Sequence, residues 1–213
     1  MVDFSAAIDS ANSSGCTDIV VWRALRKRLG FAQFRREPDM VVIRATAARL
    51  ELEAPYHPAL PYRARRAGGA WLGPATGWVF PLGAEQALRA LCQDIWAVDG
   101  SIAAMRDMVD LQIKVDERVP FRTVFEAHET PIYLVGREIA ASLRNLRGAR
   151  PGRGVRFLTG KPRCLASPST WSTSIPDGAV FIIRDVPRCA IGRFREAVSD
   201  AGHVEEGTPR TEG

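Results

Sequence analysis

The stretch that most constrains the fold of this chain runs from Leu50 to Trp96 and contains two tryptophans, Trp71 and Trp78, only seven residues apart. A Gly-Pro pair between them is typical of a tight turn, so the two tryptophans are expected on the two strands of a hairpin. A short basic helix is predicted before the hairpin and a longer amphipathic helix after it. The stretch therefore predicts a small folded module.

The elements of this module follow from the spacing of its apolar residues and helix breakers. Gly68-Gly69 should end the first helix, because glycine adopts the left-handed conformation that helix C-termini use. In the second helix, Leu88, Leu91 and Ile95 fall on one face and predict its packing side. The expected order is two strands, a helix, a hairpin and a helix, at residues 41–46, 49–54, 57–67, 71 with 78–80, and 84–96.

A second set of elements is predicted after a boundary at residues 99–107. Apolar and polar residues alternate at 109–115, which indicates a half-buried strand. The hydroxyl-rich residues 167–174 are expected to form turns. Further strands are expected at residues 123–127, 131–135, 155–158 and 179–183, and helices at residues 137–144 and 187–197.

The fold class that these patterns predict is α+β. It consists of two small modules, residues 41–98 and 108–198, each a short, mostly antiparallel sheet with packed helices. Residues 1–40 are interpreted as an N-terminal helical segment. Residues 199–213 are polar and acidic towards their end, which predicts a disordered tail.

The chain has a moderate net charge of +5, but its basic residues are mostly of one type. Three lysines among 29 basic residues leave 26 arginines, whose forked head groups bind phosphate and carboxylate and stack on aromatic or base faces. A GC-rich genome also produces such a bias. No apolar run approaches the roughly 20 residues needed to cross a bilayer, and the N-terminus has no signal-peptide pattern, so a cytoplasmic location and no membrane partner are expected.

Cysteine and histidine residues do not indicate a metal site. The four cysteines, Cys16, Cys92, Cys164 and Cys189, are far apart and include no CxxC pair, so they are expected to be reduced and mostly buried. The three histidines are equally scattered. No metal and no cofactor are therefore predicted.

The first candidate binding cluster lies in the tryptophan module. Arg63, Arg65 and Arg66 belong to the predicted basic helix and precede Trp71 and Trp78. Arginines neutralise phosphates, and exposed aromatic faces can stack on unpaired bases. The alternative interpretation is that both tryptophans form the core of a small domain, with the arginines on its solvated face.

The second candidate cluster lies within residues 139–176, which carry seven basic residues and no acidic one. Glycine and proline interrupt this segment, so its charges cannot line one regular helix and a flexible basic loop along a phosphate backbone is expected. Alternatively, the charges meet acidic residues such as Glu126, Glu129 and Glu138, or a partner protein. The seven residues are Arg144, Arg147, Arg150, Arg153, Arg156, Lys161 and Arg163.

No catalytic residue is assigned from the sequence. Pro162 stands where a phosphate-binding loop of the Walker type requires a hydroxyl. A hydrolase would have to pair Ser169 or Ser172 with His128 and Asp177. A nuclease or nucleotide-hydrolysing enzyme would need clustered carboxylates, for which the candidates are Glu126, Glu138, Asp177 and Asp185.

The tryptophan module resembles the HARP-type modules of DNA-annealing helicases and short modules of uncharacterised plasmid and integrative-element proteins. The resemblance covers about fifty residues and implies a comparable small fold. Leu72 and Gly77 stand where such modules commonly carry Asp and Lys. The residues that carry the resemblance are Pro55, Tyr56, Pro58, Leu60, Ala67, Gly69, Trp71, Trp78, Phe80 and Leu82.

The second half resembles the C-terminal region of the same mobile-element proteins. The similar segments are residues 133–140, 151–155 and 184–188. This resemblance implies a plasmid or integrated-element context and no particular reaction.

These observations lead to a non-enzymatic, mobile-element accessory protein that binds nucleic acid, DNA rather than RNA, through its arginine clusters. The alternative is an inhibitor that binds an acidic protein surface and blocks either conjugative transfer (fertility inhibition) or a host defence system. A lesser alternative is a nuclease or a nucleotide-hydrolysing enzyme.

Overall fold

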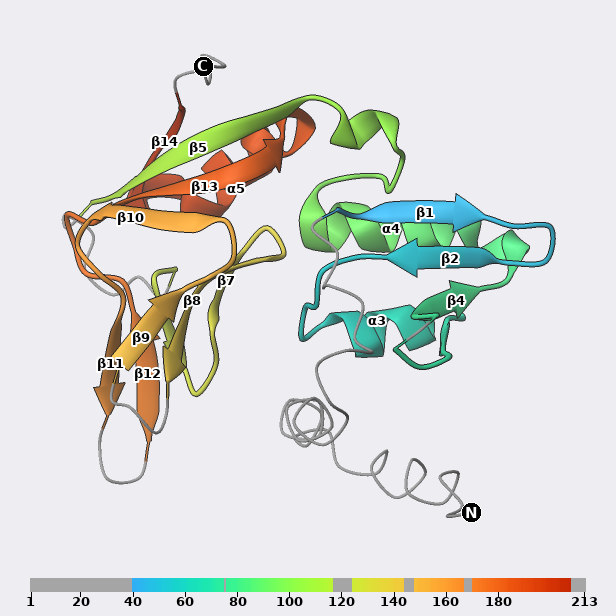
Figure 1. The fold of residues 1–213 in the computed structure, drawn as a ribbon, viewed down its shortest axis with the longest axis horizontal. Coiled ribbons are helices and arrows are strands. Elements are labelled where there is room, and N and C mark those ends of the chain that lie inside the picture. The colour runs from blue at the N-terminus through green and yellow to red at the C-terminus, as the bar shows by residue number, and fades with distance from the viewer. Residues whose placement is uncertain (1–39, 75, 117–123, 144–147, 167–169, 208–213) are drawn as a thin grey trace. The chain divides into compact units, whose positions relative to one another are not determined.

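The computed structural model of the protein describes residues 40–74, 76–116, 124–143, 148–166 and 170–207 (Figure 1). The predicted N-terminal helical segment therefore lies outside the described residues up to residue 39, and so do Arg144, Arg147 and Ser169. All described residues belong to one compact unit, Pro38–Gly213.

The predicted α+β class is confirmed. The described part of the chain forms three α-helices and four small antiparallel sheets. Its buried apolar side chains gather in two clusters, one from the elements between residues 41 and 108 and one from those between residues 97 and 204. None of the described helices combines the length and the apolar character required to cross a membrane.

The first cluster lies between a four-stranded sheet and two helices. The sheet order is β1-β2-β4-β3, and its register places Leu52 opposite Trp78 and Leu50 opposite Phe80. Helix α4 runs behind β1 and β2 in Figure 1 and contributes Leu88 to this cluster. The elements are β1 (Val42–Ala45), β2 (Leu50–Glu53), α3 (Leu60–Arg66), β3 (Ala70–Trp71), β4 (Trp78–Phe80), η1 (Leu82–Ala84) and α4 (Glu85–Trp96). The predicted hairpins and both helices of this region are confirmed.

The second cluster is enclosed by three sheets and one helix, with strand orders β10-β13-β5-β14, β11-β12-β6 and β7-β8-β9. A short turn, η2 (Ala103–Met105), precedes them. The strands are β5 (Met108–Val115), β6 (Glu126–His128), β7 (Ile132–Leu134), β8 (Arg137–Leu143), β9 (Gly148–Pro151), β10 (Val155–Thr159), β11 (Arg163–Ala166), β12 (Trp171–Ser174), β13 (Val180–Pro187) and β14 (Gly202–Glu206). The helical elements are η3 (Arg188–Ala190), α5 (Ile191–Val198) and η4 (Ser199–Ala201).

The helix expected at residues 137–144 is wrong, because residues 137–143 form strand β8. A two-residue turn, Val135-Gly136, joins β7 to β8 and leaves Leu134 opposite Arg137. Both turn residues have positive φ, 46° and 70°, which is the pattern of a type I′ hairpin turn. A β-branched residue is rare in this conformation, so the sequence gives no clear turn signal.

Gly136 also packs directly against the end of α4. A β-carbon at this position would overlap the indole of Trp96 and approach the Ile95 carbonyl oxygen to 2.8 Å. Trp96 is buried, and its indole N–H finds no hydrogen-bond acceptor among the described residues. The β7–β8 turn therefore joins the second cluster to the first through a contact that only glycine permits.

Two further expectations are corrected by the strands at the end of the chain. The predicted disordered tail is wrong for residues 199–206, because Ser199–Ala201 form η4 and Gly202–Glu206 form β14, which pairs with β5. The hydroxyl-rich segment was expected to form turns, but residues 171–174 form β12. Its buried Thr173 hydroxyl lies 2.9 Å from the Ser142 hydroxyl of β8, so the polar side chains of this strand are satisfied by a remote partner.

The cysteines are free thiols in the described part of the chain, where three of them lie. Cys92 is buried, and burial raises the pKa of its thiol to about 12. Cys164 is half-buried and Cys189 is exposed. The expectation of mostly buried thiols therefore holds only for Cys92, and Cys16 lies outside the described residues.

Candidate nucleic-acid interface

Helix α3 presents basic and aromatic side chains on one face. Its buried residues are Leu60 and Ala64, and Tyr62, Arg65 and Arg66 are exposed. Positions three and four residues apart share a helix face, so these exposed side chains are neighbours. The first turn of α3 carries no acidic residue.

Each of the two arginines lies over an aromatic ring. The Arg66 guanidinium carbon is 5.6 Å from the centre of the Tyr62 ring, and its Nη1 donates a hydrogen bond of 3.4 Å to the Tyr62 hydroxyl. The Arg65 guanidinium carbon is 5.9 Å from the Trp78 ring centre. Both distances are within the range of cation–π attraction. The helix thus holds its positive charges against aromatic faces.

The two tryptophans have different environments. Their ring centres are 5.6 Å apart and the rings are tilted by 56°. Trp78 is only 6% exposed and belongs to the core, as the alternative interpretation of the sequence expected. Trp71 is 40% exposed, because its strand β3 lies at the edge of the sheet. Only Trp71 can therefore offer a ring face to a ligand.

The β3–β4 turn carries an exposed aliphatic side chain directly after Trp71 in the sequence. Leu72 is 52% exposed, and its amide donates to the Gly77 carbonyl over 3.0 Å, which closes the turn. Gly73 and Gly77 have φ values of 93° and 81°, which only glycine adopts without strain. We call the group formed by Tyr62, Arg65, Arg66, Trp71 and Leu72 the aromatic–arginine surface. Sequence reasoning missed Tyr62 and Leu72 as members, although the i, i+4 spacing of Tyr62 and Arg66 indicates their contact.

Arg63 is directed away from this surface. Its Nη1 lies 3.3 Å from the Asp94 carboxylate of α4, and both side chains are exposed to solvent. An exposed ion pair of this kind contributes little to stability. The structure therefore separates Arg63 from the other two arginines of its predicted cluster.

His57 precedes α3 and supports its first turn. Its Nδ1 accepts a hydrogen bond of 3.2 Å from the Ala59 amide, and its ring centre lies 5.0 Å from that of Tyr133. Burial, and secondarily the positive charge of Arg63, lower the pKa of His57 to about 4. His57 is therefore neutral at physiological pH.

The described residues of the second predicted cluster do not form one flexible loop, so this expectation is wrong for them. Arg150 lies in β9, Arg156 in β10 and Arg163 in β11, which are strands of three different sheets. Arg150 is also paired with Glu138 across 2.9 Å, one of the acidic partners that the alternative interpretation named. Strand pairing, which needs residues remote in sequence, orders this segment despite its glycines and prolines.

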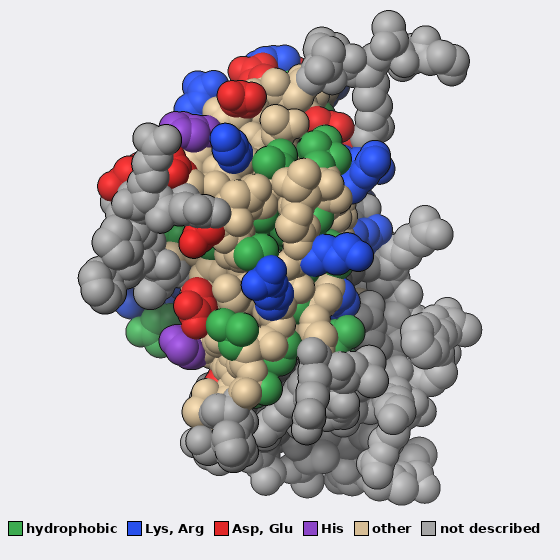
Figure 2. All heavy atoms as spheres, turned by 90° about the vertical axis from the view of Figure 1, so that its left-hand side faces the viewer, with side chains coloured by type: hydrophobic (Ala, Val, Ile, Leu, Met, Phe, Trp, Pro, Cys, Tyr) green, Lys and Arg blue, Asp and Glu red, His purple; other side chains and the backbone are tan. Residues whose placement is uncertain are grey.

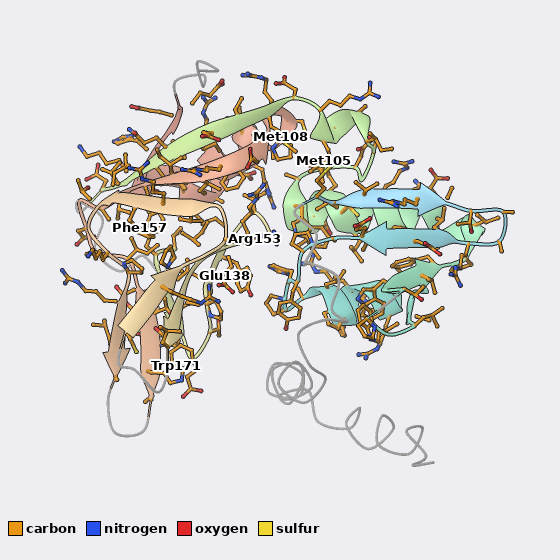
Figure 3. The ribbon with its side chains drawn as sticks, in the orientation of Figure 1. Met105, Met108, Glu138, Arg153, Phe157 and Trp171 are labelled. Atoms are coloured by element: carbon orange, nitrogen blue, oxygen red, sulfur yellow. The ribbon has the colours of Figure 1, made fainter. Side chains whose placement is uncertain are left out.

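The five described residues of this cluster lie on strands of three different sheets and on the two connections between those strands. Arg153 and Lys161 lie beyond opposite ends of β10, whose five residues span roughly 13 Å at about 3.3 Å per residue. Figure 3 shows Arg153 at the β9–β10 connection and Phe157 further along β10. In Figure 2, Lys and Arg side chains lie mainly over the middle and right of the visible face, and Asp and Glu side chains lie mainly towards its left and upper edges.

The enzymatic alternatives find little support in the described residues. Ser172 donates its hydroxyl to the Glu126 carboxylate over 3.1 Å, so that hydroxyl is directed to a carboxylate rather than to His128, its neighbour across the ladder. The Glu138 carboxylate forms an ion pair with Arg150. Asp177 is exposed in the turn before β13. Asp185 lies on β13, away from the β6 strand of Glu126. Within the described ranges, no three His, Cys, Asp or Glu side chains are grouped as metal ligands would be.

The comparisons with known proteins gave no match: no family model, no curated protein and no solved structure matches this chain. The resemblance to HARP-type modules and to mobile-element proteins therefore stays a prediction. The candidate site is supported by its own geometry alone.

Proposed function

We propose that this protein binds nucleic acid through the aromatic–arginine surface and acts, without catalysis, as an accessory factor of a plasmid or related mobile element. The observation that carries the proposal is the exposed indole of Trp71, which lies 5.6 Å from the Trp78 ring that the Arg65 guanidinium covers. DNA rather than RNA is the expected ligand, because the mobile elements whose proteins the sequence resembles consist of DNA.

The exposure of the aromatic rings supports a stacking role. Large aromatic side chains are usually buried, yet Tyr62 is 65% exposed and Trp71 is 40% exposed. Stacking of a base on an aromatic ring contributes about 1–3 kcal/mol and requires an unpaired base. The proposed ligand is therefore a single strand in preference to a duplex, whose bases are already stacked on one another.

The arginines support contacts to phosphates beside the stacked bases. Each phosphate neutralised on a single strand lowers the slope of log K against log salt concentration by about 0.7. Arg65 and Arg66 together should therefore give a slope near −1.4. This slope is modest, because stacking rather than charge supplies much of the binding.

Trp71→Ala is the variant that tests the proposal. We expect it to weaken binding to a labelled single strand of about 20 nucleotides by about 5- to 150-fold, because a stacked base is lost. The measurement is fluorescence anisotropy with nuclease-treated protein between about 50 and 200 mM salt.

Leu82→Ala is the matched control, because Leu82 is an exposed apolar residue in η1 and does not belong to the surface. The control should bind the strand as the unsubstituted protein does. Equal affinities of all three proteins would contradict the proposal, as would a failure of the unsubstituted protein to bind at the lowest salt concentration.

A second candidate function is the inhibition of conjugative transfer or of a defence system through binding to an acidic protein surface. Leu72 favours it, because the exposed side chain of this leucine adds apolar area next to Trp71 in the sequence, and exposed apolar area is more typical of protein interfaces than of the more polar nucleic-acid interfaces. Leu72→Ser distinguishes the two functions. It should leave single-strand affinity unchanged and should restore transfer of a co-resident plasmid only if the partner is a protein.

A further inference from the structure

A cleft of about 360 Å³ adjoins helix α3. Arg63 of α3 and Asp94 of α4 line it, together with residues of the β7–β8 hairpin and of α5. Its volume lies within the usual range of about 300–1,000 Å³ for small-ligand pockets. The side chains that matter for its chemistry are His57, Arg63, Asp94, Tyr133, Arg193 and Glu196.

Two ring systems form the aromatic part of the cleft. The His57 and Tyr133 rings meet edge to face, with centres 5.0 Å apart and an angle of 75° between the ring planes. Because His57 is neutral at physiological pH, this wall carries no charge. A flat, uncharged group can therefore pack against it.

The charged residues of the cleft balance one another. Arg63 pairs with Asp94 at 3.3 Å, and Arg193 pairs with Glu196 at 2.6 Å. Two positive and two negative side chains give no net attraction for a phosphate. The edge of a nucleobase carries both donors and acceptors, so it can bond to carboxylate and guanidinium groups at once.

The cleft and the aromatic–arginine surface share helix α3. Tyr62 of the surface and Arg63 of the cleft are consecutive residues of α3, about 100° apart around the helix. A strand that stacks on the surface and crosses α3 therefore arrives at the cleft.

We propose that this cleft binds one unstacked nucleobase of the single strand that the aromatic–arginine surface holds. The proposal rests on the proposed function, because the surface delivers the strand. His57 and Tyr133 pack against the base, and the two ion pairs bond to its edge. The strand is thus held at two places, by stacking on Trp71 and by a base in the cleft.

The first test is photocross-linking of a single strand that contains 5-iodouracil, followed by identification of the cross-linked peptides. Iodouracil cross-links efficiently to aromatic side chains that it stacks upon. The expected result is two cross-linked peptides, one with Trp71 and one with Tyr133. A cross-link at Trp71 without one at Tyr133 overturns the cleft proposal and leaves the proposed function intact. No cross-link and no anisotropy change would overturn both.

The second test fills the cleft with Ala197→Phe, since Ala197 lines it on the last turn of α5 and is half-buried. We expect this variant to weaken single-strand binding by about 5-fold or more and to lose the Tyr133 cross-link while it keeps the Trp71 cross-link. Ala103→Phe, at an exposed alanine of η2, is the control and should behave as the unsubstituted protein. Unchanged binding and cross-linking by Ala197→Phe would overturn the proposal, and the first test does not depend on either variant folding.

Discussion

Helix α3 and residues 139–176 are both rich in arginine in the sequence, but the structure arranges their arginines differently. Residues 139–176 carry more than twice as many basic residues as α3, and no acidic ones. In the structure, however, Arg150, Arg156 and Arg163 lie in three different sheets. The smaller cluster keeps Arg65 and Arg66 on one helix face, each against an aromatic ring.

The difference follows from the geometry of the two backbones. A helix returns every third or fourth residue to the same side, so a short run of arginines is concentrated on one face. A strand advances about 3.3 Å per residue and alternates its sides, so arginines three residues apart diverge. A count of charges in the sequence therefore overstates the basic character of a segment that folds into strands.

The largest expected effect concerns Trp78, which belongs to the buried apolar cluster between the β1-β2-β4-β3 sheet and helices α3 and α4. Trp78→Ala should lower the free energy of unfolding by about 3–5 kcal/mol, because it leaves a cavity between sheet and helices. Trp71→Ala should lower it by about 1 kcal/mol or less, since the ring is partly exposed. Urea denaturation of both variants measures the difference. Similar losses for the two tryptophans would remove the distinction between a core ring and a ligand-binding ring.

Acid pH should lower the free energy of unfolding through His57, which precedes α3. Its pKa is about 4 in the native state and near 6.5 in the unfolded chain, so only the unfolded chain takes up a proton between these values. Stability is therefore complete above about pH 6.5 and falls by up to about 3 kcal/mol as the pH drops towards 4. Urea denaturation between about pH 7 and pH 4.5 should show this loss, and His57→Gln should lack it. An equal loss in both proteins would assign the acid sensitivity to other groups.

The smallest expected effect is on single-strand binding when two positive charges are removed either from α3 or from residues 139–176. Arg65→Gln with Arg66→Gln should weaken single-strand binding and reduce the magnitude of the salt slope by about 1.4. Arg156→Gln with Arg163→Gln removes the same charge but should change affinity about twofold or less. Anisotropy titrations across salt concentrations measure both. A larger effect of the second pair would reverse the ranking of the clusters.

The first half of the fold was predictable because its signals are local. The turn glycines Gly73 and Gly77 and the apolar spacing of α4 lie within the elements that they specify. The exposure of Trp71 could not be deduced in the same way, because it depends on the position of β3 at the sheet edge. Sequence reasoning therefore placed the two tryptophans on one hairpin without distinguishing the core ring from the exposed one.

The second half was predicted less well because its strands depend on remote partners. Thr173 is buried in a strand through its contact with Ser142, 31 residues away. Gly202 starts β14 opposite Val115, and nothing near residue 202 in the sequence indicates that pairing. The cleft likewise combines Asp94, Tyr133 and Arg193, which no local pattern connects.

The contact between Gly136 and Trp96 has a consequence for how such a chain can diverge. Any side chain at position 136 would overlap the indole, and the backbone there already has a positive φ. The two positions are therefore constrained as a pair over evolutionary time. A natural variant that gains a side chain at position 136 would need a smaller residue at position 96, and coordinated change at these two sites would be the record of that contact in a set of diverged sequences.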